Sequence, residues 1–322
     1  MRRGLTGRDL VRPRELLSPP PAGKVFFTTC VVTNSLRVNR YTHTHTHTHE
    51  LRKIIIHLIA NCASYSARVV FDWTFFIPGT CTNVHIYMST LAFPTPTTTI
   101  RVRHAGPPTH VNVGRVFCVG KNYAKHAIEM GCDPEKEPPV FFCKQPANVF
   151  QPDVTGPVPF PPATSNLHHE AELVLVIGRA SEPNVPVARA DAPDYIYGWA
   201  VGLDMTRRDV QQAAKGQGLP WDMSKSFDFA APITDITLVD DWAVEDAHAI
   251  TCLVNGDGKQ AGVLGDMIWN VADIIHYLST FVALQPGDLI FTGTPPGVSQ
   301  VKPGDVVTAK ITGLPDLRVT YV

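Results

Sequence analysis

Apolar residues in this chain occur in many short runs that end at glycine, proline or polar turn residues. Runs of roughly four to eight residues rich in Val, Ile, Leu and Phe are typical of buried strands. Helical periodicity occurs at 124–130, at about 207–215 and at 268–278. Many short strands, few helices and Pro- and Gly-rich connections indicate a mixed, β-dominated α+β domain. The predicted strands are 115–120, 138–144, 173–177, 195–203, 250–254, 306–311 and 317–322.

Two glutamates precede the strand at 173–177 and share a face. Glu170 and Glu172 are two residues apart, and side chains two apart in a strand point the same way. Like charges at the entrance to a core repel, and burial adds to the penalty. A hard divalent cation such as Mg²⁺, Mn²⁺ or Ca²⁺ would remove it. The alternative is a pair of surface glutamates at a strand edge.

The strand at 195–203 delivers Asp204 to the turn before a helix. Thr206 and Asp209 have capping-box spacing, which predicts a helix that begins at about Arg207 and runs to Lys215. Rigid elements aim a side chain at such a turn. Taken alone, without the two glutamates, Asp204 is better explained as a helix-start carboxylate interacting with the helix dipole.

Two pairs of polar residues are spaced three apart on predicted helices. His126 and Glu129 share one face, where a carboxylate can orient an imidazole and raise its basicity. Arg208 and Gln211 share another, which suits capture of a carboxylate and an adjacent carbonyl. A solvated helix face explains either pair equally simply.

The regular pattern begins only after residue 87. Alternating Thr and His fill 42–49, a tract that could bind a transition metal or could derive from a translated nucleotide repeat. Residues 1–87 hold 11 Lys and Arg against 4 Asp and Glu, whereas the remainder holds 17 against 25. We predict that 1–87 is a low-complexity or disordered extension, that 88–112 is a lead-in segment and that 113–322 is the catalytic domain. Met88 would then be at or near the working start.

Composition excludes several classes of protein. The net charge of −1 gives no general case for binding nucleic acid or membranes, and no apolar run approaches the roughly 18 residues of a membrane helix. Seven scattered cysteines without zinc spacing indicate a reduced, intracellular protein. Cytoplasm and mitochondrion stay open, although the Arg-rich first fourteen residues loosely resemble a transit peptide.

Several short motifs follow one another along the chain. They are VGKNY at 119–123 with His126 and Glu129, HHEAEL at 168–173, GLDMT at 202–206, RDVQ at 208–211, KSFD at 225–228 and Gly287-Asp288 through TGTP at 292–295. Taken together and in this order, they resemble the fumarylacetoacetate hydrolase superfamily. The resemblance covers about residues 113–322 and is closest to the small fumarylacetoacetate-hydrolase-domain proteins that act on acylpyruvates and oxaloacetate. Lys121 stands where an arginine is commoner in the family, and we assign it no role.

The resemblance implies the rolled mixed-β fold of this family and a homodimer. It makes Asp204 the third metal carboxylate beside Glu170 and Glu172, with Mg²⁺ or Mn²⁺ as cofactor and positions left open for a small 2-oxo acid substrate. Lys225, otherwise a surface lysine, would stabilise negative charge on that substrate. Thr294, with Arg208 and Gln211, would contact it.

The implied function is metal-dependent cleavage of a C–C bond in a small 2,4-dioxo acid, as in acylpyruvate hydrolysis. Glu129 would hold His126, which takes a proton from the attacking water, and a metal-bound pyruvate enolate would follow with Lys225 nearby. The same enolate would arise from oxaloacetate decarboxylation, or from proton transfer alone in a tautomerase or isomerase. An inactive metal-binding scaffold protein is a further alternative.

Overall fold

The computed structural model describes residues 25–31, 37–43, 71–77, 80–86, 97–103, 109–129 and 138–322. The chain divides into two units, Met1–Thr95 and Pro96–Val322. The described part of the first unit consists of two antiparallel hairpins, which pair β1 (Val25–Val31) with β2 (Arg37–His43) and β3 (Phe71–Ile77) with β4 (Thr80–Ile86). Met88 and all of the Thr-His tract except Thr42 and His43 lie outside the described residues.

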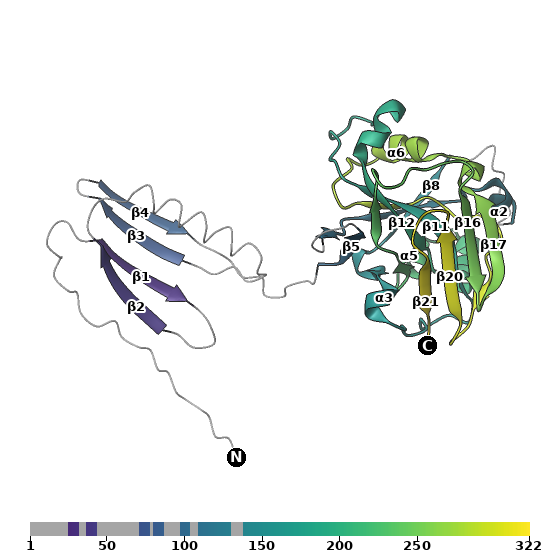
Figure 1. Cartoon of the computed structure of the whole chain (residues 1–322), viewed down its shortest axis with the longest axis horizontal. Coiled ribbons are helices and arrows are strands. Elements are labelled where there is room, and N and C mark those ends of the chain that lie inside the picture. Colours follow the sequence, from purple (N-terminus) through teal and green to yellow (C-terminus); the bar gives the residue numbers. More distant parts are fainter. Residues whose placement is uncertain are drawn as a thin grey trace, which may run out of the picture. The chain divides into compact units, whose positions relative to one another are not determined.

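The second unit is organised around a curled, mixed sheet of eight strands (Figure 1). Its central strand, β11 (Ala171–Ile177), pairs antiparallel with β12 and β18 and is buried along its whole length. The sheet order is β6 (Thr109–Asn112), β5 (Thr99–Arg103), β15 (Ile236–Leu238), β12 (Ile196–Leu203), β11, β18 (Leu289–Phe291), β7 (Val116–Gly120) and β8 (Val140–Lys144).

A four-stranded antiparallel sheet covers one face of β11. It runs β17 (Asp257–Val263), β16 (Ala249–Val254), β20 (Val306–Ile311) and β21 (Leu317–Thr320). Leu173 and Leu175 pack in the core cluster that contains Ile250 of β16. Val174 and Val176 point the other way, into a second cluster. Alternate residues of β11 therefore meet two apolar environments, which explains why the strand reads as a continuous apolar run.

The remaining pairings are short. β10 (Leu167–His168) lies between β13 (Thr206–Arg207) and β19 (Gln300–Val301), and β9 (Val149–Phe150) pairs with β14 (Ala231–Pro232). The described helices are α2 (Ala124–Glu129), α3 (Pro152–Thr155), α4 (Arg208–Gln217), α5 (Asp222–Lys225) and α6 (Val271–Ser279), with 3₁₀ turns η1 (Pro146–Asn148), η2 (Arg189–Tyr195) and η3 (Leu264–Asp266). None of the described helices is long and apolar enough to cross a bilayer.

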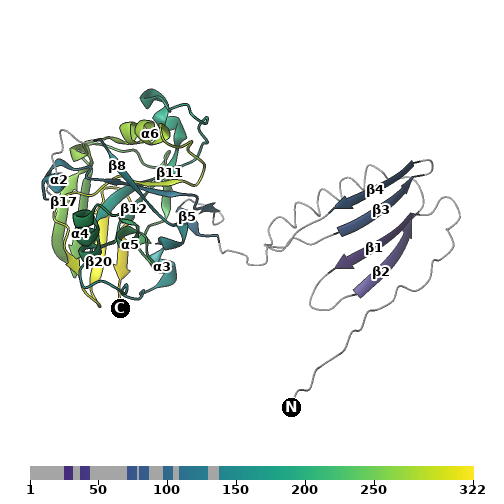
Figure 2. The ribbon, with the colours of Figure 1, turned by 180° about the vertical axis from the view of Figure 1, so that it is seen from behind.

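Three local predictions are corrected. The capping box at the start of α4 is wrong, because the Thr206 hydroxyl donates to Glu170 Oε1 at 3.1 Å instead of receiving a helix N–H. Asp209 accepts from Thr164 Oγ1 at 2.6 Å. Residues 221–225 follow a Gly- and Pro-containing break in the sequence that predicts a loop, but they contain the short helix α5, which packs against α4 (Figure 2). Ile268 lies before the N-cap Asn270 of α6, outside the helix predicted to include it.

Candidate metal centre and active site

The three carboxylates expected to hold a metal converge in the structure. Oxygen atoms of Glu170, Glu172 and Asp204 lie within 4.8 Å of one another, and the three side chains are buried. Glu170 and Glu172 come from the start of β11, and Asp204 follows the last residue of β12. The Asp204 backbone N–H donates to the Glu170 carbonyl at 2.9 Å, so strand pairing fixes the spacing of these residues.

Three buried cations approach two of these carboxylates. Lys225 Nζ lies 2.9 Å from Glu170 Oε2 and 2.5 Å from Asp204 Oδ2. Arg208 Nη2 lies 2.5 Å from Glu170 Oε1. Lys144, at the end of β8, places Nζ 2.8 Å from Asp204 Oδ1. Burial of three like charges is tolerable because an equal number of opposite charges surrounds them.

Glu170 and Glu172 have opposite electrostatic environments. Burial alone raises the pKa of Glu170, but the charges of Lys225 and Arg208 hold it well below its usual range. Burial raises the pKa of Glu172 well above its usual range, and the charges of Asp204 and Glu170 add to the effect. Among the described residues no cation forms an ion pair with Glu172, which accepts the Gly293 N–H at 2.8 Å.

The donor set fits a hard divalent ion. Glu172 lacks a positive partner, and Asp204 Oδ1 accepts no hydrogen bond from the described residues although Lys144 lies close to it. An ion among the three oxygens would supply the missing positive charge. Carboxylate oxygens without a thiolate or imidazole in the group suit Mg²⁺ or Mn²⁺.

Lys144 and Gln260 are site residues that the sequence interpretation missed. Gln260 is buried, accepts the Ala171 N–H at 3.1 Å and donates to Thr294 Oγ1 at 2.7 Å. Its carboxamide oxygen also lies 2.9 Å from His169 Nδ1. The only signal for Lys144 was its position at the end of an apolar strand, and Gln260 had none.

His126 and Glu129 lie together on α2, as their spacing predicts. Nδ1 of His126 is 3.4 Å from Oε2 of Glu129, and the imidazole is buried whereas the carboxylate is exposed. Burial lowers the pKa of His126 despite the opposing influence of Glu170 and Glu129. The imidazole is therefore neutral at pH 7 and able to accept a proton.

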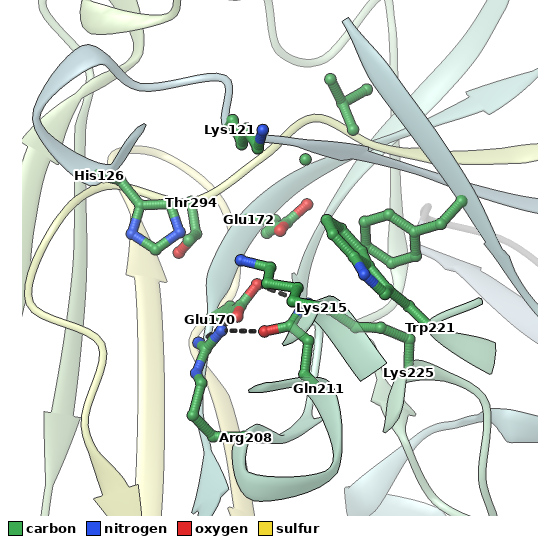
Figure 3. Close-up of a pocket in the computed structure, with 13 residues that line it drawn as sticks. Lys121, His126, Glu170, Glu172, Arg208, Gln211, Lys215, Trp221, Lys225 and Thr294 are labelled. Carbon is green, nitrogen blue, oxygen red and sulfur yellow. Dashed lines mark hydrogen bonds and ion pairs between the residues drawn. The ribbon is translucent and has the colours of Figure 1, made fainter. Parts of the chain in front are cut away.

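A pocket open to solvent lies over Glu170 and Glu172 (Figure 3). His126 and Thr294 form one wall and Trp221 the opposite one, with Glu170 and Glu172 between them. Thr294 Oγ1 donates to the Ala171 carbonyl at 2.8 Å, so its hydroxyl hydrogen is already used within the protein. Its contact with a substrate stays a prediction. Seven of the nine predicted site residues line this pocket, and Glu129 and Asp204 do not: the seven are His126, Glu170, Glu172, Arg208, Gln211, Lys225 and Thr294.

Comparison with known proteins agrees with this geometry. Residues 115–322 match the family described as fumarylacetoacetate (FAA) hydrolase C-terminal. The chain is 41% identical over 202 residues to the mitochondrial oxaloacetate decarboxylase of Dictyostelium discoideum. The match covers 62% of this chain and 89% of that protein. It is 41% identical over 205 residues to the mitochondrial oxaloacetate tautomerase of Rattus norvegicus, covering 63% and 89% of the two chains.

A relative of known structure shares the fold. The Pseudomonas aeruginosa fumarylpyruvate hydrolase, solved in complex with Mn²⁺ and pyruvate, superposes with a TM-score of 0.66 at 39% identity. The match covers 72% of this chain and 99% of that one. The residues matched by the family, 115–322, include Glu170, Glu172 and Asp204. The chain therefore belongs to the fumarylacetoacetate hydrolase family.

Proposed function

We propose that this protein is a divalent-metal-dependent enzyme that cleaves a C–C bond in small 2-oxo acids. The reaction is hydrolysis of an acylpyruvate, decarboxylation of oxaloacetate, or both. The observation that carries the proposal is the group of three buried carboxylates at the base of a pocket that also contains His126 and Arg208. The activities named for the relatives support it.

Glu170, Glu172 and Asp204 would hold Mg²⁺ or Mn²⁺. The ion would supply Lewis acidity to the oxygens of a bound 2-oxo acid. Arg208 and Gln211, joined by a hydrogen bond of 2.6 Å from Nη1 to Oε1, would orient the substrate carboxylate.

The remaining residues would move or stabilise charge. The neutral imidazole of His126 would take a proton from the water that attacks the distal carbonyl, with Glu129 orienting the ring. The pKa of Lys225 is raised because Asp204 and Glu170 outweigh the effect of its burial. Its ammonium therefore stays charged and would stabilise negative charge that develops on the substrate.

The test compares two reactions in one variant. Hydrolysis needs an activated water and decarboxylation does not, so His126→Ala should lower acylpyruvate turnover by about a hundredfold or more while oxaloacetate turnover falls much less. Steady-state assays with Mg²⁺, Mn²⁺ and chelator measure both. An equal loss of both activities would contradict a water-activating role, and wild-type turnover that persists in chelator would contradict the metal.

A tautomerase is the second candidate, favoured by the name of the Rattus norvegicus relative. Interconversion of the keto and enol forms of oxaloacetate requires only proton transfer, for which the neutral His126 is suited. Following the enol absorbance separately from carbon dioxide release distinguishes the two reactions.

Two further proposals concern the working protein. We propose a homodimer, supported by the family resemblance, and a catalytic chain that needs only residues from about Met88 onward. Light scattering checks the first, and turnover by a chain beginning at Met88 checks the second. The names of the two mitochondrial relatives favour the mitochondrion over the cytoplasm, which fractionation of cells would decide.

A further inference from the structure

Two side chains on one wall of the pocket come from segments that touch each other. Thr294 and His126 line that wall together (Figure 3). The loop after β18 carries Thr294 and meets helix α2, which carries His126, because the Gly297 N–H donates to Glu129 Oε2 at 3.4 Å. The two side chains are therefore placed to contact the same small molecule in the pocket.

Hydrogen bonds fix the orientation of the buried Gln260 carboxamide. Its Oε1 accepts the Ala171 N–H at 3.1 Å, and its Nε2 donates to the Pro295 carbonyl at 2.8 Å. A backbone N–H can only donate and a carbonyl can only accept, so the oxygen and nitrogen of this carboxamide cannot be exchanged. His169 Nδ1, 2.9 Å from the same Oε1, must then carry a hydrogen. The second Nε2 hydrogen goes to Thr294 Oγ1 at 2.7 Å.

The direction of the Thr294 hydroxyl follows from this bond. Because Oγ1 receives a hydrogen from Gln260, it gives its own hydrogen to another group, the Ala171 carbonyl at 2.8 Å. A hydroxyl oxygen has two lone pairs, and Gln260 is its only donor among the described residues. One lone pair remains, so Thr294 can accept a hydrogen bond from a bound molecule but has no hydrogen left to donate.

A 2-oxo acid in its keto form offers Thr294 no hydrogen. Its carboxylate and carbonyl oxygens only accept, so Oγ1 would face them as one lone pair against another. The water of the proposed hydrolysis has two hydrogens. With Nδ1 of His126 held by Glu129, Nε2 takes one of them as a proton, and the second needs an acceptor of its own.

We infer that Thr294 Oγ1 accepts the second hydrogen of the water that His126 deprotonates, and that Gln260 is a positioning residue that fixes the Thr294 hydroxyl in this accepting state. Thr294 then orients the nucleophile, a role different from the contact with the 2-oxo acid that the family resemblance implies. This role rests on the proposed hydrolysis, to which it adds the group that holds the water.

The step consumes one water molecule and needs no other co-reactant. The water oxygen bonds to the distal carbonyl carbon, one hydrogen passes to His126 Nε2, and the carbonyl π electrons move to the carbonyl oxygen. The other hydrogen stays on the new hydroxyl group, held by Thr294. When the carbonyl forms again, the C3–C4 bond breaks and its electron pair stays on C3 of the pyruvate part. His126 returns its proton to C3, and the released carboxylic acid loses its proton to solvent.

The test compares two reactions of one variant of the full chain in Mg²⁺. Thr294→Val keeps the size of the side chain and removes its oxygen. It should lower kcat for acetylpyruvate hydrolysis by about tenfold, the effect of one neutral hydrogen bond. Decarboxylation of oxaloacetate uses no water and should stay within about twofold of wild type, as should the pyruvate dissociation constant measured by calorimetry. Thr294→Ser keeps the hydroxyl and should retain most of the hydrolysis.

Thr292→Val is the matched control. The Thr292 hydroxyl is buried and donates to the Leu173 carbonyl of β11 at 2.9 Å, as Thr294 donates to the Ala171 carbonyl, but Thr292 does not line the pocket. This variant should have the wild-type ratio of hydrolysis to decarboxylation. The ratio does not depend on the folded fraction, because unfolded protein contributes to neither activity.

A second variant tests Gln260 through the same ratio. Gln260→Met removes the donor to Thr294 and should lower hydrolysis several-fold, with a smaller change in decarboxylation. Because Gln260 acts through the Thr294 hydroxyl, the double variant with Thr294→Val should have the same ratio as Thr294→Val alone. A further fall of the ratio in the double variant would overturn the positioning role of Gln260.

Other outcomes would overturn the role of Thr294. An equal loss of both reactions in Thr294→Val, or weaker binding of pyruvate, would assign Oγ1 to the 2-oxo acid. Slower keto–enol conversion of oxaloacetate, followed by the enol absorbance, would assign it to the enol hydroxyl. Unchanged hydrolysis would leave the proposed function standing without Thr294.

The wild type decides whether the proposed function fails as well. Decarboxylation of oxaloacetate without hydrolysis of acetylpyruvate would remove the role of Thr294 and keep the decarboxylase. Turnover of neither acid in Mg²⁺ or Mn²⁺ would contradict the proposed function itself.

Discussion

On one side of the carboxylate cluster Glu170 forms ion pairs with two cations, whereas on the other side Glu172 forms none with the residues that the structure describes. Lys225 and Arg208 form ion pairs with Glu170 at 2.9 and 2.5 Å. Glu172 receives the Gly293 backbone N–H and repels Asp204 and Glu170. These two side chains are only two residues apart, yet the protein stabilises the charge of one and destabilises the charge of the other.

The different electrostatic environments of Glu170 and Glu172 indicate that the two carboxylates have different roles in the site. On the Glu170 side, positive side chains hold the carboxylate ionised and in place before any ion arrives. On the Glu172 side, the unbalanced negative charge is what a cation would relieve. Substitutions that remove one charge at a time can test whether the two sides differ in this way.

The largest expected effect is on metal affinity. Glu172→Gln removes the carboxylate with which none of the described cations forms an ion pair, so the affinity for Mn²⁺ should fall by more than the roughly hundredfold that loss of an outer hydrogen-bonding partner can cause. Electron paramagnetic resonance titration measures free Mn²⁺ directly. An unchanged affinity would place the ion away from Glu172 and remove the basis of the comparison.

Stability without metal should move in opposite directions in the two variants. Glu170→Gln leaves Lys225 and Arg208 short of a buried partner and should lower the free energy of unfolding by about 3 kcal/mol. Glu172→Gln removes repulsion and should raise it by about 1 kcal/mol. Urea unfolding in chelator measures both, with exposed Glu245→Gln as a control that should stay within about 0.5 kcal/mol of wild type. The same sign for both variants would refute the comparison.

These stability differences should depend on pH with opposite signs. Folding raises the pKa of Glu172, because burial and the charges of Asp204 and Glu170 disfavour its ionised form. The wild type therefore loses stability as pH rises from the usual 4.5 through the raised value, and the advantage of Glu172→Gln should grow over that range. The pKa of Glu170 is lowered by folding. Its contribution is present above pH 4.5 and is lost as pH falls through that lowered value, so the deficit of Glu170→Gln should shrink in acid.

The smallest expected effect lies at the edge of the pocket. Glu129 raises the pKa of His126 against the effect of burial, so Glu129→Gln should lower that pKa further. The acid limb of the acylpyruvate pH profile should then move to lower pH by less than about one unit, with about a tenfold loss of kcat. A shift toward higher pH would show that Glu129 does not act through the imidazole.

Local sequence pattern was enough to predict a strand at 173–177, which the structure extends to 171–177, and the shared direction of Glu170 and Glu172. Both follow from the two-residue period of a strand, and the convergence with Asp204 agrees with the family motifs. The type and approximate place of α2, α4 and α6 were also predicted, because apolar spacing and turn residues are local signals.

Tertiary contacts decided what the sequence could not show. Thr206 has capping-box spacing, but its hydroxyl is drawn to the buried carboxylate of Glu170. Lys144 and Gln260 become part of the site only through contacts between residues far apart in the sequence, Lys144 with Asp204 and Gln260 with the Ala171 N–H. The end of an apolar strand is a weak signal for Lys144, and Gln260 has none. The position of β15 between β5 and β12 likewise depends on pairing across more than a hundred residues.

The hydrogen bond from the Asp204 N–H to the Glu170 carbonyl has a consequence for evolution. This bond continues the backbone pairing of β11 with β12. The spacing between Glu170 and Asp204 therefore cannot change unless these two strands separate. Lys121 and Lys215 project from a turn and a helix instead, and these can accept replacements without disturbing that pairing. Substitutions at the mouth of the pocket can therefore change substrate preference in evolution while Glu170, Glu172 and Asp204 keep their positions.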